Sequence, residues 1–516
     1  MHPRLRFWLI VALGATAGVV VSFGLAQEIY ALATLIVLLI AWLALEWRGG
    51  PRPEAWVLAA VLVGYIVANR GFAQLQLVSG LPLFPAEAAL FAGLTAGLLR
   101  MAFRQTALLT RDALNAAIFL WIFLGTARLW TDFGVHGFVA LRDYATIYYA
   151  LYFFVAQSLA RHAASARLLR VATVGAFAAL PVVYLIFSRF PDFFIQSVQF
   201  RGVPLLYFKD DLVAANLFAG FFLLMTVPTW PAPLRFGLAL AAYATAFTIN
   251  SSRAAIVGLL VTSVWWAVAR RWTPWKFQAA AAPLALTVLA IVAVVQPRDF
   301  SQSKLHALYE HAVSMVDFSG TGQYSSEDRR YVGDNNRFRL VWWRSVAEET
   351  RENGPVFGLG FGADLTSRFL RTYELDLGDE FTTRSPHSIV LTVLGRMGLT
   401  GLVAFAAIVG AMFLRTLRLA RLARTDDTAL APLGWWSVSW VMLVSACFGV
   451  VLEGPMGAIL FWTSLGLANA TSTDALAAAA ATSANSADSP TPAPATLASE
   501  PTPPPAVPDP AASLRA

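Results

Sequence analysis

The chain has 516 residues, of which 57% are hydrophobic and only 13% are charged, and its mean hydropathy is +0.60. Because a soluble globular domain usually carries about a quarter charged residues, this composition excludes an ordinary soluble domain. The net charge of +7 comes from arginines scattered between apolar segments, a pattern typical of membrane topology signals and not of a nucleic-acid partner.

Apolar segments of membrane-spanning length recur along most of the chain, and each needs about 20 residues as a helix. They are unbroken and lack period-two alternation, which favours helices over a closed barrel. We therefore expect an all-α fold, a polytopic transmembrane helical bundle of about 12–14 spans. The expected spans cover residues 7–24, 29–46, 55–69, 83–99, 113–130, 143–160, 171–188, 211–227, 234–249, 254–269, 277–296, 398–414, 432–450 and 456–469.

Arginines and lysines gather on alternate connections between these spans, which predicts a topology by the positive-inside rule. Both termini are expected on the cytoplasmic side of a bacterial inner (cytoplasmic) membrane, and the long polar loop on the periplasmic side. The expected regions are 1–296 with about 11 spans, the large periplasmic loop 297–386 containing short helices, the C-terminal spans in 387–469, and a disordered cytoplasmic Ala, Pro, Ser and Thr tail at 470–516.

The loop 297–386 differs from the rest of the chain because it carries charges of both signs and several aromatic residues. Within it, the pattern predicts a helix over 338–351, with N-cap candidates at 334–336 and a stop at Asn353-Gly354-Pro355. A loop of this length between spans usually has a function. We expect a small folded lid or domain.

Arg253 is the first candidate functional residue, in the polar turn Asn250-Ser251-Ser252-Arg253 at the expected outer end of two spans. A membrane-embedded arginine is costly unless it is paired or lines a wet cavity, so such charges are functional hypotheses. The alternative is an interfacial arginine whose head reaches the water. Both interpretations remain open from position alone.

A second candidate site lies on the predicted loop helix, where Arg339 and Trp343 are one turn apart. An indole at that spacing can support a guanidinium that faces an anion. The glycine-rich segment 354–362 follows and predicts a tight backbone turn. It lacks the P-loop lysine and a preceding strand, so a nucleotide site is not expected.

His387 is the third candidate, in Arg384-Ser385-Pro386-His387-Ser388 at the start of an apolar helix on the membrane surface. A structural interfacial histidine and a catalytic one both fit this position. No second histidine or carboxylate lies at metal-ligand spacing from it, so we expect no metal. The segment is followed by the pattern Gly395-x-x-Gly398-x-x-Gly401.

Together, these three segments resemble the O-antigen ligase and O-antigen polymerase superfamily over residues 245–405. The resemblance implies transfer of a glycan from an undecaprenyl diphosphate carrier to an acceptor at the periplasmic face, without a cofactor. The acceptor that it implies is lipid A core or a growing glycan, and transfer to a protein also stays open. In that family the histidine is usually followed by asparagine, whereas Ser388 stands here, and the family's loop arginine maps best to Arg339, with Arg337 as the other register.

The chemistry of a diphosphate leaving group suits this set of residues. Arginine presents forked donors that match phosphate oxygens, so Arg253 and Arg339 are expected to bind the diphosphate as its charge grows. His387, with an ordinary pKa of about 6.5, is expected to accept the proton of the acceptor hydroxyl. The residues expected to bind substrate are Arg337, Arg384, Trp343 and Ser388.

Several alternatives stay open at this stage. Arg384 either holds the lipid phosphate or pairs with Asp379 or Glu380, and we favour the pairing. For the whole protein, the alternatives to a ligase are a polymerase of the same superfamily, a non-catalytic polysaccharide transporter, or a degenerate member with an interaction role. A transporter is expected to carry ionisable residues at mid-bilayer depth in paired broken helices, which this sequence represents poorly.

Overall fold

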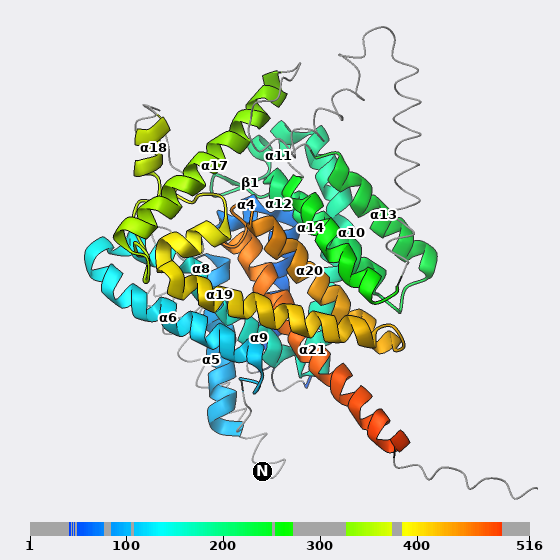
Figure 1. Cartoon of the computed structure of the whole chain (residues 1–516). Coiled ribbons are helices and arrows are strands. Elements are labelled where there is room, and N and C mark those ends of the chain that lie inside the picture. Colours follow the sequence, from blue (N-terminus) through cyan, green and yellow to red (C-terminus); the bar gives the residue numbers. More distant parts are fainter. Residues whose placement is uncertain are drawn as a thin grey trace, which may run out of the picture.

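The computed structural model describes residues 41–76 except Leu43, Leu45, Trp47 and Arg48, then 84–104, 108–249, 253–271, 327–373 and 384–487. The described residues form a helical bundle with one two-residue strand pair (Figure 1), so the expected all-α fold is confirmed. The expected spans 7–24 and 277–296 lie outside the described residues, as do most of the span 29–46 and the first part of the loop 297–386.

The first half of the described chain contains mostly short and medium helices. A π-helical turn, η1, interrupts the first of them, and Asn69 follows it with φ 52°. The elements are α3 (Pro53–Val63), η1 (Gly64–Ala68), α4 (Arg70–Ala73), α5 (Pro85–Arg104), α6 (Ala113–His136), α7 (Phe138–Asp143), α8 (Ala145–Tyr148), α9 (Leu151–Ala160), α10 (Ala163–Arg189), α11 (Pro191–Ser197), β1 (Gln199–Phe200) and β2 (Val203–Pro204).

The second half contains the centre of the bundle and the elements above it. The antiparallel pair β1 and β2, with Phe200 opposite Val203, leads into this half. The elements are α12 (Asp210–Met225), α13 (Ala232–Phe247), α14 (Arg253–Val268), α17 (Glu327–Asn353), α18 (Ser367–Tyr373), α19 (Ile389–Leu422), the short 3₁₀ turn η4 (Asp427–Ala429), α20 (Leu430–Ala446) and α21 (Pro455–Ala487).

The core of the bundle lies around α12 and α20. Every residue from Leu212 to Leu224 is buried, because α10, α13, α14 and α20 pack around α12. In α20, 83% of the most apolar window is buried, compared with 33–44% in the other long apolar helices. A helix that is apolar all round belongs inside a bundle, and one with exposed apolar side chains faces lipid.

Five described helices are long and apolar enough to cross a membrane: 85–103, 113–136, 163–189, 389–422 and 427–446. Three shorter apolar helices accompany them. Large apolar side chains on their outer faces are exposed, including Phe91 at 74% and Trp130 at 87%. Apolar surface of this extent is typical of contact with lipid. The chain is therefore a multi-pass membrane protein.

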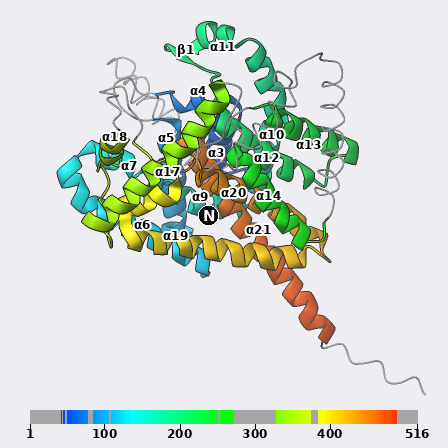
Figure 2. The same ribbon diagram turned by 45° about the horizontal axis from the view of Figure 1, so that its top comes forward.

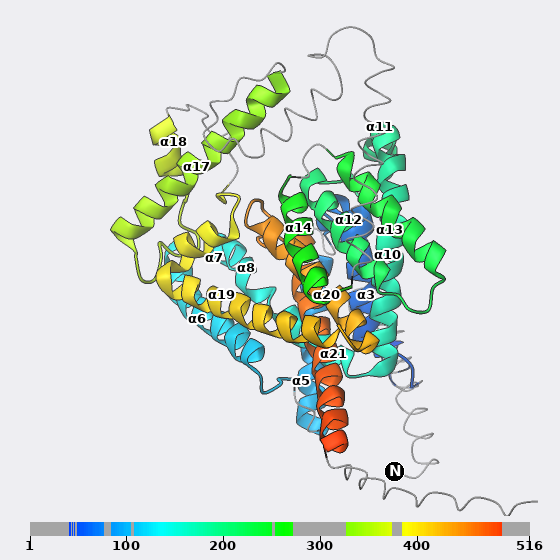
Figure 3. The same cartoon turned by 45° about the vertical axis from the view of Figure 1, so that its right-hand side comes forward.

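A broken span and a longer C-terminal helix differ from the expected segments. The span expected at 143–160 is broken into α8 and α9, because the chain turns at Tyr149 and Ala150, which lie deep in the core. The tail expected to be disordered from residue 470 instead continues as α21 to Ala487, since its alanines are strong helix formers. Figure 3 shows this end of α21 projecting beyond the bundle. Residues 488–516 lie outside the described part.

Helices α17 and α18 lie above the bundle and share a small core of their own, formed by Trp342, Val346, Leu365 and Phe369 (Figure 3). The helix expected over 338–351 is confirmed, and it ends at Asn353 where the stop was expected. The N-cap expected at 334–336 is wrong, because α17 begins at Glu327. Asparagine and aspartate cost only a few tenths of a kcal/mol inside a helix, and the acidic residues at 327 and 328 suit a helix N-terminus.

Helix α19 runs along one side of the bundle and packs on α6 at one end and on α14 and α20 at the other (Figure 2). It is longer than the span expected at 398–414, and it is kinked at Gly398, where φ is 60°. The kink lets the first two turns of α19 pack against α17. We call α17 and α18, with their shared core, the upper domain. The start of α19 therefore lies where the upper domain meets the bundle.

Candidate functional site

His387 precedes α19, and its backbone is in the left-handed region with φ 54°. Few non-glycine residues adopt this conformation, although histidine tolerates it better than most. The imidazole packs edge-on against Trp342, with 5.9 Å between ring centroids, and the His387 amide donates to Ser385 Oγ over 3.3 Å. Strained residues held in this way cluster at functional sites.

The electrostatic surroundings of His387 keep its ring neutral. Its pKa is lowered from 6.5 to about 4, with burial as the largest cause. The positive charges of Arg339 and Lys209 lower the pKa further, while Asp211 acts in the opposite direction. A neutral imidazole has a free lone pair at neutral pH and can accept a proton.

Arg339 extends from α17 toward the connection that follows α20. Its Nη1 donates to the carbonyl oxygen of Phe448 over 2.9 Å, whereas its buried Nε has no hydrogen-bond partner among the described residues. Burial lowers the pKa of this guanidinium. A desolvated cation with an unused N–H donor is a strong site for an anion.

Lys209 and Asp211, at the start of α12, were not expected at the site. Lys209 Nζ lies 3.3 Å from Asp211 Oδ2 and donates to the Val450 carbonyl oxygen over 3.5 Å. The Lys209 amide donates to Asn69 Oδ1 over 3.0 Å. The available sequence signal was Lys-Asp-Asp directly before an apolar run, although acidic residues in a first helical turn also suit the helix dipole.

Glu453 is a second acidic group that the sequence pattern did not reveal. It lies on the connection between α20 and α21, where Thr392 Oγ1 donates to its Oε1 over 2.7 Å. Burial raises the pKa of Glu453, while hydrogen bonds from Ser385 and Thr392 lower it. This carboxyl group therefore joins the connection after α20 to the first turn of α19, next to His387.

The glycine-rich segment 354–362 forms the expected tight turn and lies against the kink of α19. Gly358, Gly360 and Gly362 have φ values of 74°, 102° and 87°. The amide of Leu359 donates to the carbonyl oxygen of Gly395 over 2.7 Å, and that of Gly360 to Arg396 over 3.2 Å. The two glycine motifs of the sequence therefore contact each other through their backbones.

Two aspartates of the bundle hold the same turn from the other side. Asp132 on α6 accepts from the Phe361 amide over 2.7 Å, and Asp143 on α7 accepts from the Gly362 amide over 3.1 Å. Asp132 is itself paired with Arg128 at 3.0 Å. The upper domain is therefore fixed to the bundle at this turn.

Arg384 and Arg396 complete this anchor. Arg396 pairs with Asp143 at 2.8 Å, and Arg384 donates to the Gly362 carbonyl oxygen over 2.8 Å and lies 3.7 Å from Asp143. The partners expected for Arg384, Asp379 and Glu380, lie outside the described residues. In the described part, Arg384 supports the turn and not the surroundings of His387.

The remaining expected residues occupy different positions around the site. Trp343 Nε1 donates to the Pro386 carbonyl oxygen over 2.6 Å and so holds the residue before His387. Ser388 is buried and is the N-cap residue of α19, although its side chain makes no capping hydrogen bond. Arg337 is exposed on α17, whereas Arg339 points inward.

Arg253 is the first residue of α14, and the far end of that helix fixes its position. Arg424 Nε, near the end of α19, donates to the carbonyl oxygen of Val268 over 2.8 Å, and Arg271 Nε donates to Ala423 over 2.7 Å. Since α14 ends beside the end of α19, its first residue lies toward the end of the bundle that holds the start of α19. Arg253 and His387 are therefore at the same end.

Comparison with known families identifies the segment that carries these residues. Residues 238–406 match the family described as O-antigen ligase. The match assigns an O-antigen ligase domain to this segment and supports membership of the O-antigen ligase superfamily. The O-antigen ligase domain contains Arg253, Arg339 and His387, whereas Lys209 and Glu453 lie outside the matched residues. No curated protein matches the chain.

The O-antigen ligase family generally comprises glycosyltransferase-like ligases and polymerases that act on lipid-linked glycans. The site described above offers a proton acceptor, two cations and a protonatable carboxyl group within the same few helix ends. No group of three or more His, Cys, Asp or Glu side chains with the arrangement of a metal site occurs in the described ranges. The positive charges of Arg339 and Lys209 near His387 suit an anion.

Proposed function

We propose that this protein is an O-antigen ligase-like glycosyltransferase that moves a glycan from an undecaprenyl diphosphate carrier to an acceptor hydroxyl. The observation that carries the proposal is that His387 packs on Trp342 of α17, the helix that also carries Arg339, while the positive charges of Arg339 and Lys209 lower the pKa of the imidazole. A polyanionic leaving group and a deprotonating base are the two requirements of such a transfer.

In the proposed step, the acceptor oxygen attacks the anomeric carbon of the donor sugar while the bond from that carbon to the diphosphate oxygen breaks. His387 takes the hydroxyl proton, and the diphosphate leaves with the bonding electron pair. Arg339 and Lys209 stabilise the charge that develops on the diphosphate, and Arg253 adds a third cation from the same end of the bundle. The Nε of Arg339, which has no hydrogen-bond partner among the described residues, supports this role.

The inward direction of Arg339 supports it over Arg337 as the loop arginine. Trp343 then acts by holding Pro386, and Ser388 by starting α19, so both position His387 and do not bind the glycan. We further propose that the site faces the periplasm of the inner membrane, with loop 297–386 above it, because the arginine distribution supports that orientation.

The test is transfer by the purified full-length protein from undecaprenyl diphosphate-linked glycan, with lipid A core and unextended glycan as separate acceptors. Release of the lipid diphosphate is followed in a single turnover with donor saturating. His387→Gln is expected to bind donor but to lose roughly 10²- to 10⁴-fold in rate, as when a general base is removed. Product with only the glycan acceptor would identify a polymerase.

Arg339→Ala is expected to lose roughly 10²- to 10³-fold in the same assay, and Arg339→Lys to recover little, because lysine lacks the fork. The matched control is Arg344→Ala, which removes an exposed arginine from the same helix. Wild-type rates in both His387→Gln and Arg339→Ala would refute the mechanism. An inactive Arg337→Ala beside an active Arg339→Ala would assign the diphosphate contact to Arg337.

A further inference from the structure

A cavity of about 530 Å³ lies at the opposite end of the bundle from His387. The central helices fix this separation. Lys209 precedes α12 and Val227, which lines the cavity, follows it; Phe448 follows α20 and Ala431, which also lines the cavity, lies at its start. Sixteen residues of α12 place the two regions roughly 24 Å apart.

One face of α10 supplies both a charged and an apolar part of the cavity wall. Arg167, Arg170, Val171 and Val174 all line it, and their spacing puts them on the same side of the helix. Arg167 is nearest to the start of α10, and Val174 lies about two turns further into the bundle. The wall therefore changes from cationic to apolar with increasing depth.

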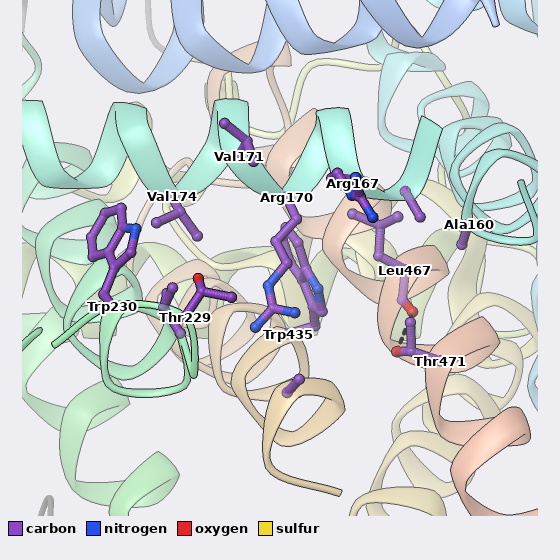
Figure 4. A pocket seen from close by; sticks show the side chains of 13 residues that line it. Ala160, Arg167, Arg170, Val171, Val174, Thr229, Trp230, Trp435, Leu467 and Thr471 are labelled. Atoms are coloured by element: carbon purple, nitrogen blue, oxygen red, sulfur yellow. Dashed lines mark hydrogen bonds between the residues drawn. The ribbon is translucent and has the colours of Figure 1, made fainter. Parts of the chain in front are cut away.

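Among the described residues, few groups interact with the charges of Arg167 and Arg170. Arg170 Nη2 donates to the carbonyl oxygen of Thr226 over 3.1 Å, which leaves further donors of the fork free. Arg167 is exposed. No carboxylate lines the cavity, and in the described ranges no acidic side chain forms an ion pair with either arginine. Figure 4 shows the Arg170 side chain extending from α10 into the cavity, toward Trp435.

The other walls are mainly apolar and aromatic. Trp230, on the connection between α12 and α13, and Trp435, on α20, face the cavity with Leu467 of α21 (Figure 4). Free phosphate would satisfy the arginines but leave these surfaces uncovered. A zwitterionic lipid would bring a cation of its own next to them. An anionic head joined to an apolar body complements both parts.

We propose that this cavity binds an anionic phospholipid of the surrounding membrane, of the phosphatidylglycerol type. The headgroup phosphate lies between Arg167 and Arg170, and the glycerol and upper acyl chains lie against Val171, Val174 and Trp435. Basic pockets between transmembrane helices are a known mode of anionic lipid recognition. The inference goes beyond the proposed function, since it uses neither His387 nor Arg339.

The test is lipid titration of the purified full-length protein by native mass spectrometry. Phosphatidylglycerol and phosphatidylcholine with identical acyl chains are compared, and the first bound phosphatidylglycerol is expected to be retained roughly tenfold more tightly. Arg167→Gln and Arg170→Gln should each reduce this preference severalfold. Because Arg167 is exposed, its variant is expected to fold even if the Arg170 variant does not.

The matched control is Arg421→Gln, an exposed arginine near the end of α19 that does not line the cavity, and it should keep the preference. Equal affinity for the two lipids would overturn the proposal, as would a preference that survives in Arg167→Gln. Displacement of phosphatidylglycerol by millimolar inorganic phosphate would assign the site to free phosphate instead. None of these readouts depends on glycan transfer.

Discussion

At the scale of single residues, the structure explains why some groups could be predicted and others could not. His387 and Arg339 stand in recognisable segments, so the sequence pointed to them. Lys209 and Glu453 stand in unremarkable places beside apolar spans, and only the packing of α12 and the connection after α20 brings them near His387. Long-range contacts of this kind leave no spacing signal in one sequence.

The low pKa of His387 predicts an unusual pH dependence of transfer. Burial and two neighbouring cations hold the pKa at about 4, so the ring stays neutral at pH 5.5. An ordinary histidine would be about nine-tenths protonated there. Single-turnover rates are expected to stay level from pH 7.5 to 5.5 and to fall only toward pH 4. A decline centred near pH 6.5 would show that His387 titrates normally.

The same shift has a consequence for stability, which serves as the control for the pH profile. Because the folded pKa is depressed, the unfolded chain binds the proton more readily, and stability is lost as pH falls from about 6.5 through about 4. Thermal unfolding in detergent micelles should show a smaller acid-induced loss in His387→Gln than in wild type. Identical losses would mean that another group dominates.

At the scale of elements, the turn 354–362 and the kink of α19 form one unit that local pattern only partly predicted. The glycines indicated a tight turn, but not that it would lie against a second glycine motif. A Cβ on Gly358 would lie 2.5 Å from the amide nitrogen of Gly398, and one on Gly398 would lie 2.4 Å from that of Gly358. A side chain at either glycine would therefore clash with the backbone of the other.

This reciprocal contact gives a prediction about stability. Gly358→Ala combines a left-handed φ of 74° with a backbone clash, and the strain alone costs about 1–3 kcal/mol. The midpoint of thermal unfolding in micelles should fall by several degrees. Gly410→Ala, in α19, is the control, because nothing lies within 4 Å of its added Cβ. Equal midpoints for the two variants would contradict the packing described here.

Other elements show where periodicity succeeds and fails. The helix over 338–351 was predicted because its apolar face and its Asn-Gly-Pro stop are local features, and both occur in α17. The break between α8 and α9 was not predicted, because no glycine or proline marks it and tyrosines such as Tyr149 find partners only in the fold, here Glu87 at 2.8 Å.

At the scale of the whole molecule, the all-α membrane fold followed from composition and span length, whereas the orientation remains a prediction. It is tested by impermeant labelling of single cysteines in a Cys447→Ala background. Positions expected outside are Ser252, Gly320 and Ser385, and those expected inside are Thr273 and Thr425. Labelling of position 273 but not 320 in intact spheroplasts would reverse the topology.

The last part of α21 gives the molecule an extended stalk. Residues 477–487 continue the helix past the packed bundle, and at 1.5 Å per residue these eleven residues span roughly 16 Å (Figure 3). Its sequence is rich in alanine and contains no charged residue. Because this part of the helix projects from the bundle, a group fused after Ala487 would lie away from the packed helices. Reporter or affinity tags belong at that end.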